Sequence, residues 1–112
     1  MQHPLFPRVA GLAGVLLLLA GCATPPPAAI TQPTVVEAAC GECLFGLPGR
    51  DCDLAVRVHG RAYFVDGVPL DSLGDAHAAD GMCQVIRKAR VTGRVAQGRF
   101  VASRFELLPA GR

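Results

Sequence analysis

Residues 54–66 read LAVRVHGRAYFVD and indicate the fold more directly than any other part of the chain. From Leu54 to Val58 every second residue is a large apolar one, which is the period of a half-buried β-strand. His59 and Gly60 then fit a two-residue hairpin turn into a second strand over residues 61–65. The stretch therefore predicts two antiparallel strands joined by a tight turn.

The segments on either side of this hairpin predict three more strands. An extended segment starting at Thr34 precedes the hairpin, and glycines along it allow a bend. Residues 90–95 alternate in the same way, and Gln97-Gly98 fits a turn into a last strand over residues 100–108.

One short helix is predicted between the third and fourth strands. Apolar Met82, Val85, Ile86 and Ala89 recur at the spacing of one helical face, and Asp80 precedes them as a candidate N-cap. Basic residues follow near the C-terminal end, where the helix dipole favours them.

This order of three strands, a helix and a closing hairpin resembles the OB fold, a small five-stranded Greek-key barrel. We therefore expect a mainly β domain in the order β-β-β-α-β-β, with an open antiparallel sheet carrying one packed helix as the alternative. Both architectures use the same predicted core: Val36, Leu54, Val56, Val58, Phe64, Val85, Ile86, Val91, Val95, Phe105 and Leu107.

The N-terminal segment predicts export and lipid attachment. Apolar residues 9–20 follow Arg8 and suit a signal peptide, but they are too few for a comfortable membrane span. The run LLAGC over residues 18–22 resembles a bacterial lipobox. This resemblance implies cleavage after Gly21 and attachment of lipid to Cys22. The competing interpretations are a signal peptide removed without lipidation and a helix that stays in the membrane.

The same resemblance implies a location. A small residue at Ala23, in place of an aspartate, resembles the signal that sends lipoproteins to the outer membrane in many Gram-negative bacteria. The several acyl chains of a processed lipoprotein hold it stably in the membrane, so we expect a membrane-anchored domain. We expect this domain to face the periplasm.

The chain then divides into a signal peptide (1–21), the lipidated cysteine with a proline-rich tether (22–33), a small domain (34–109) and a short tail (110–112). Prolines favour extended chain in the tether. A domain this small buries little apolar surface and is therefore only marginally stable. Disulfides or a bound metal ion commonly stabilise domains of this size.

Composition and motifs exclude several function classes. A formal net charge of +2 at pH 7 is too small to predict a nucleic-acid partner. The chain has no Gly-rich phosphate loop and no serine in a nucleophile elbow, so we expect no enzyme. A small ligand or another envelope protein remains as the expected partner.

Four cysteines of the mature domain, Cys40, Cys43, Cys52 and Cys83, form an even set, which favours two disulfides in an exported protein. On a regular strand Cys40 and Cys43 point to opposite faces. We therefore expect bonds between Cys43 and Cys52 and between Cys40 and Cys83, each stabilising by roughly 2–4 kcal/mol.

The same cysteines are candidates for two other kinds of chemistry. With His77 as an additional ligand they suit zinc, and as reduced thiols they suit copper(I). Cys40-Gly-Glu-Cys43 also resembles the dithiol of thioredoxin-like proteins, although no helix is predicted to begin there.

A second candidate site lies on the second and third strands, the face that OB barrels commonly use for binding. Its residues are Arg57, His59, Arg61 and Tyr63, whose basic and aromatic side chains suit an oligosaccharide or an anionic group. Aspartates near His77 are explained by helix capping and solvation rather than by a cation site.

Residues 40–108 also resemble a group of small secreted bacterial proteins of unknown function. The resemblance rests on CGECLFG at 40–46, CDLAV at 52–56, YFVDG at 63–67 and DAHAADGMC at 75–83. It implies a shared domain and no particular activity. We expect a disulfide-stapled binding or structural module, with a thiol-dependent zinc or copper carrier or sensor as the alternative.

Overall fold

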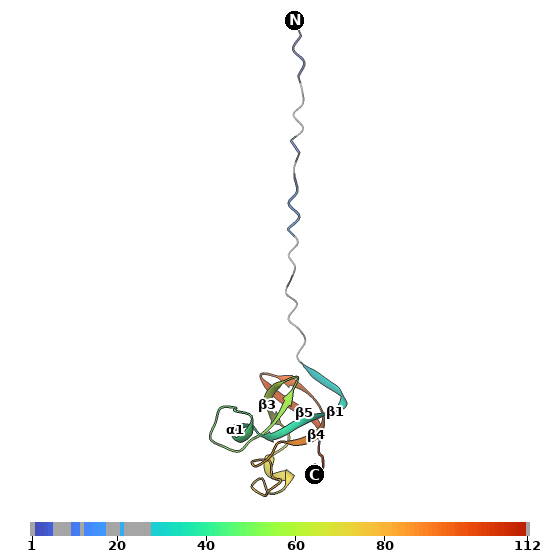
Figure 1. Cartoon of the computed structure of the whole chain (residues 1–112). Coiled ribbons are helices and arrows are strands. Elements are labelled where there is room, and N and C mark those ends of the chain that lie inside the picture. Colours follow the sequence, from blue (N-terminus) through green and yellow to red (C-terminus); the bar gives the residue numbers. More distant parts are fainter. Residues whose placement is uncertain (1, 6–9, 12, 18–20, 22–27, 112) are drawn as a thin grey trace.

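The structure, a computed structural model, describes residues 2–5, 10–11, 13–17, 21 and 28–111 (Figure 1). Cys22 and residues 23–27, on which the lipidation site and half of the tether segment were predicted, lie outside the described residues. Within the described ranges, no helix combines the length and apolar character that crossing a membrane requires.

The domain consists of five strands with short helical turns in two of the connections. In chain order the elements are β1 (Ala29–Cys40), α1 (Gly41–Leu44), β2 (Leu54–Val58), β3 (Arg61–Asp66), the 3₁₀ helix η1 (Leu70–Leu73), β4 (Arg87–Ala96) and β5 (Arg99–Leu107).

The five strands close into a barrel in the order β1-β2-β3-β5-β4, with β4 pairing back onto β1. All neighbours are antiparallel except β3 and β5, which pair in parallel where Val65 meets Phe100. The predicted OB-like barrel is confirmed. The open-sheet alternative is wrong because pairing between β1 and β4 leaves no free edge there.

Both predicted hairpin turns are confirmed. His59 and Gly60 have φ angles of 50° and 79°, and Gln97 and Gly98 have φ angles of 52° and 73°. Two successive residues with positive φ form the turn whose twist matches the strands that it joins. These turns fix the register of β2 with β3 and of β4 with β5.

The helix predicted from Asp80 is wrong. Residues 75–86 form successive turns, in which the Val85 N–H donates to the Gly81 carbonyl at 3.1 Å and no further helical bond follows. The chain cannot continue as a helix because Arg87 already pairs with Ala38 of β1, and this pairing closes the barrel. The helical element between β3 and β4 is η1 instead.

The first strand extends further toward the N-terminus than predicted. Residues 29–33 were predicted to be part of the tether but belong to β1, and Ala29 pairs with Arg94. The register of β1 with β4 shifts between Ile30 and Thr34, a stretch that contains Pro33. Proline cannot donate a ladder hydrogen bond, so an irregularity at this point is expected.

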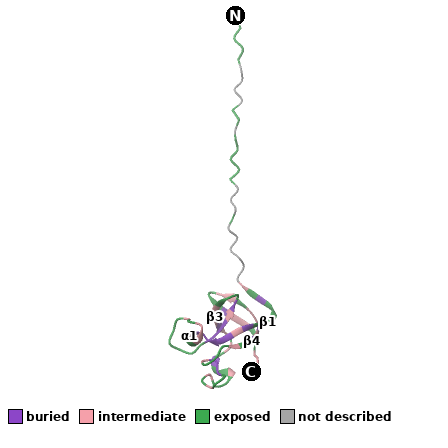
Figure 2. Ribbon diagram, in the orientation of Figure 1, coloured by how far each residue is buried: buried purple, intermediate pink, exposed green. Residues whose placement is uncertain are grey.

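The core lies inside the barrel, where the strands carry most of the buried residues (Figure 2). Of the predicted core residues, Val36, Leu54, Val56, Val58 and Val91 are buried, and Val95, Phe105 and Leu107 pack against them partly exposed. Val85 and Ile86 were wrongly placed in the core, because the turn leaves them 39% and 42% exposed. Phe100 and Met82 are the largest fully buried side chains.

Candidate thiolate metal site

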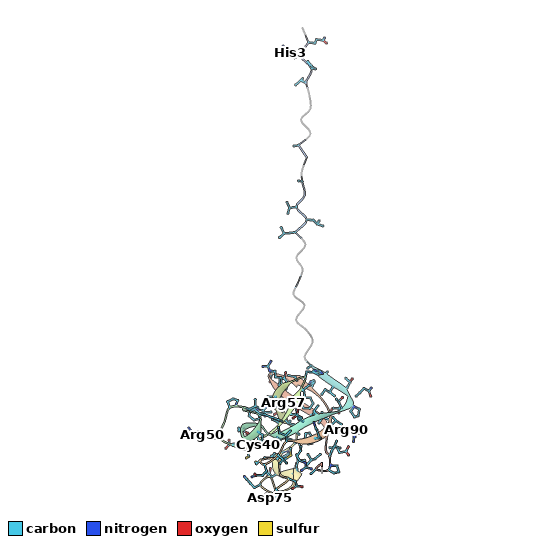
Figure 3. All side chains as sticks on the ribbon, viewed as in Figure 1. His3, Cys40, Arg50, Arg57, Asp75 and Arg90 are labelled. Atoms are coloured by element: carbon cyan, nitrogen blue, oxygen red, sulfur yellow. The ribbon has the colours of Figure 1, made fainter. Side chains whose placement is uncertain are left out.

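Four cysteines from separate parts of the chain meet at one end of β1. Cys40 is the last residue of β1, Cys43 lies in α1, Cys52 in the loop before β2, and Cys83 in the turns before β4. Figure 3 labels Cys40. The four Sγ atoms all lie within 4.8 Å of one another, so the cysteines form one cluster.

Backbone hydrogen bonds hold the three segments of this cluster together. The Cys40 N–H donates to the Met82 carbonyl at 2.8 Å, which brings the Cys83 segment beside the end of β1. The Gly41 N–H donates to the Asp53 carbonyl at 2.8 Å and ties in the Cys52 segment. The thiols are therefore positioned by main-chain contacts that do not depend on bonds between the sulfurs.

Two glycines allow these segments to approach so closely. A Cβ atom on Gly41 would lie 2.7 Å from Cε1 of Phe64 and 2.9 Å from Cδ1 of Leu47. A Cβ atom on Gly81 would collide with the backbone carbonyl of Ala76. Each glycine is adjacent or nearly adjacent to a cysteine, and overpacking at such positions typically costs about 1–3 kcal/mol.

Cys52 is the centre of the cluster. Its Sγ lies 2.8 Å from that of Cys83, 3.4 Å from that of Cys43 and 3.5 Å from that of Cys40. None of these distances is near the roughly 2.05 Å of a disulfide. The structure has the four cysteines as free thiols and shows neither of the two disulfides expected from the sequence, which stay a prediction.

The central position of Cys52 sets the acidity of the cluster. Hydrogen bonds from its neighbours, first from Cys83, lower the pKa of Cys52. Burial, followed by the bond to Cys52, raises the pKa of Cys83 to about 12. The hydrogen bond with Cys40 raises the pKa of Cys43 well above its usual range. Of these three thiols, Cys52 is therefore the one that loses its proton most readily.

Glu42 lies on the cluster and was not predicted as part of it. Its Oε2 is 3.6 Å from the Cys40 Sγ and accepts the Asp53 N–H at 3.0 Å. Burial acts to raise the pKa of Glu42, but hydrogen bonds, first from the Asp53 backbone, outweigh it and lower the pKa. The hydrogen bond with Glu42 in turn raises the pKa of Asp53. Glu42 thus links two of the cysteine segments.

His77 does not join the cysteines. Among the described residues, the potential metal-binding group consists of the four cysteines alone. His77 is exposed, and its N–H donates to Oδ1 of Asp75 at 2.9 Å within a local turn. The aspartates of this region likewise form no such group in the described part of the chain.

The residues predicted to form a ligand-binding face do not share one face. Because His59 and Gly60 make a two-residue turn, Arg61 pairs with Val58 and Arg57 pairs with Ala62. Directly paired residues point to the same side, so Arg57 and Arg61 point to opposite sides of the sheet.

The two arginines instead lie over different aromatic rings. The Arg57 guanidinium stacks 4.5 Å above the Phe45 ring and also pairs with Glu37 at 3.1 Å. Arg61 lies 5.5 Å from the Tyr63 ring. Ligand binding here stays a prediction, without one continuous surface to support it.

The fold and site together define a small closed β-barrel with a four-cysteine cluster at the end of its first strand. The chain belongs to the family of unknown function DUF6370, whose pattern it matches over residues 34–108. The expected membership of an uncharacterised domain family is therefore confirmed. No curated protein and no solved structure matches the chain.

Proposed function

We propose that the barrel binds one thiophilic metal ion, zinc(II) or copper(I), through Cys40, Cys43, Cys52 and Cys83. The convergence of four sulfur atoms, all within 4.8 Å of one another, carries this proposal. Thiolate ligands select soft and borderline ions over hard cations such as magnesium or calcium.

The size of the cluster supports zinc. Zn–S bonds of about 2.3 Å in a tetrahedron place the sulfurs about 3.8 Å apart. The distances of 3.4 and 3.5 Å from Cys52 to Cys43 and Cys40 are already close to this value. An outward movement of the Cys83 sulfur by about 1 Å brings the last ligand into range.

Metal binding accounts for the arrangement better than two disulfides. A sulfur atom in a disulfide bonds to one other sulfur, but Cys52 has three sulfur neighbours at 3.5 Å or less. A tetrahedral ion uses all four sulfurs at once. The pairs Cys43–Cys52 and Cys40–Cys83 remain the competing arrangement.

We also propose that lipid on Cys22 anchors the domain to the cell envelope, with the domain facing the periplasm. This part rests on the resemblance of residues 18–22 to a lipobox. A tethered thiolate site suits a metal carrier or sensor, and we assign it no catalytic role.

Metal titration of the full chain, purified in detergent under reducing conditions, tests the proposal. We expect native mass spectrometry to find one zinc(II) or copper(I) ion per molecule. Removing a residue that only hydrogen-bonds to a metal ligand commonly lowers metal affinity 10–100-fold. Cys52→Ser removes a ligand itself, so it is expected to weaken zinc binding by more than about 100-fold. Competition with a chromophoric chelator measures the affinity.

Cys22→Ser is the matched control, because it also removes one cysteine but leaves all four proposed ligands in the sequence. It is expected to retain full zinc affinity and to lose incorporation of a labelled fatty acid in cells. Four cysteines that react freely with an alkylating agent in the presence of excess zinc contradict the metal site. Fatty-acid labelling that persists in Cys22→Ser contradicts the anchor.

A further inference from the structure

We infer that the metal site is a redox switch in which oxidation joins Cys52 to Cys83 and releases the bound ion. This inference rests on the proposed metal site and adds a means of regulating it. It predicts which two of the four cysteines react, and the pair differs from both pairs expected from the sequence.

The distances favour this pair. The Cys52 Sγ lies 2.8 Å from the Cys83 Sγ, against 3.4 Å for Cys43 and 3.5 Å for Cys40. These distances describe the metal-free cluster, to which the sulfurs return once a zinc–sulfur bond opens. A disulfide requires an approach to about 2.05 Å, so in that open cluster Cys83 has the shortest distance to move.

The local backbone favours it as well. Cys52 lies in an irregular loop and Cys83 in a series of turns, so both segments adjust more readily than regular elements. Cys40 ends β1, and its sulfur accepts the Cys43 N–H at 3.2 Å within α1. This contact holds the Cys40 sulfur in place while Cys52 and Cys83 pair.

Exposure determines where an oxidant enters. Cys52 and Cys43 are exposed, Cys83 is partly exposed and Cys40 is buried, so distance rather than exposure separates Cys83 from Cys43 as the partner of Cys52. A small disulfide can therefore reach the Cys52 sulfur from solvent, and thiol–disulfide exchange requires this access.

The reaction balances with a small-molecule disulfide as the oxidant. The Cys52 thiolate attacks one sulfur of that disulfide, the S–S bond breaks, and one small thiolate leaves. The Cys83 thiolate then attacks the Cys52 sulfur of the mixed disulfide and displaces the second small thiolate. The two cysteines lose two electrons, the small disulfide gains them, and the zinc ion leaves with its charge unchanged.

Zinc release from the loaded full chain tests the switch. The protein in detergent is loaded with one equivalent of zinc, freed of reductant and treated with cystamine, a small cationic disulfide. A chromophoric chelator follows zinc release, and alkylation followed by peptide mapping identifies the disulfide. Trypsin places Cys52 in residues 51–57 and Cys83 in residues 62–87, and neither peptide contains another cysteine.

We expect zinc release to proceed in step with a disulfide between these two peptides, with Cys40 and Cys43 alkylated. Zinc that stays bound after oxidation overturns the inference and leaves the proposed function intact. Release accompanied by a Cys43–Cys52 or Cys40–Cys43 disulfide overturns it too. Reduced protein that binds no zinc at the start overturns both.

Two variants that each lack one ligand provide a matched comparison. In Cys83→Ser the mixed disulfide between Cys52 and the cysteamine group is expected to persist at least about tenfold longer than in Cys43→Ser, because its resolving thiol is missing. Equal lifetimes in the two variants overturn the assignment of Cys83. This readout does not depend on how tightly either variant holds zinc.

Discussion

Individual thiols of the cluster hold their protons to different degrees. The pKa of Cys52 is lowered by its sulfur neighbours, first by Cys83, whereas the pKa of Cys83 is raised to about 12 and that of Cys43 is raised further. At neutral pH, Cys43 and Cys83 therefore carry protons in the metal-free protein. Metal binding must expel these protons, because the thiolate is the ligand.

Zinc affinity is accordingly expected to fall as pH falls. Displacement of at least two protons makes the apparent affinity drop about 100-fold for each pH unit between pH 8 and pH 6.5. The affinity falls at lower pH because the raised pKa values of Cys43 and Cys83 keep these thiols protonated in the metal-free protein. Lower pH stabilises this protonated form and not the metal-bound form, in which the ligands are thiolates. Chelator competition at several pH values, corrected for the chelator's own titration, measures the slope. An affinity that is constant over this range contradicts the assignment of protonated thiols.

At the scale of elements, Arg87 connects the turns that carry Cys83 to the end of β5. Its Nη1 donates to the Asp80 carbonyl at 2.7 Å and its Nη2 donates to the Leu108 carbonyl at 2.8 Å. Arg87 is the first residue of β4, so these bonds fix the point at which the turns end and the strand begins.

Arg87→Met is expected to lower the free energy of unfolding by about 1.5–3 kcal/mol, the usual contribution of hydrogen bonds to a charged group. Urea unfolding of the metal-free protein measures the change. Arg90→Met is the control, because the exposed Arg90–Glu106 pair, at 3.3 Å, is expected to contribute at most about 1 kcal/mol. Equal losses in the two variants contradict the role of Arg87.

At the scale of the whole molecule, a bound ion would link three segments that the barrel brings together. Cys52 and Cys83 are separated by 31 residues in the sequence, and Cys40 and Cys52 by 12. An ion that binds the folded domain and not the unfolded chain stabilises the fold by mass action.

Zinc is therefore expected to raise the melting temperature. At a free zinc concentration 100 times the dissociation constant the gain is about 2.7 kcal/mol. For a domain of this size such a gain corresponds to a shift on the order of 10 °C. Differential scanning calorimetry measures the shift, a chelator is expected to reverse it, and Cys52→Ser is expected to lack it. Identical melting temperatures with and without zinc contradict the proposed site.

The barrel could be predicted from the sequence because its signals are local. Alternation from Leu54 to Val58 reports a strand with one buried side, and His59-Gly60 and Gln97-Gly98 supply the backbone conformations of their turns. The four cysteines were also identified as one candidate group, because their residue type alone suggests bonding or coordination.

Tertiary structure decided what these local signals do not contain. Residues 80–89 have a helical pattern of apolar residues, but pairing of Arg87 with Ala38 across the closed barrel favours turns and a strand. The register of β2 with β3 separates Arg57 from Arg61. Backbone bonds to Met82 and Asp53 gather the cysteines around Cys52. Each outcome depends on contacts between distant segments, and sequence spacing does not encode their geometry.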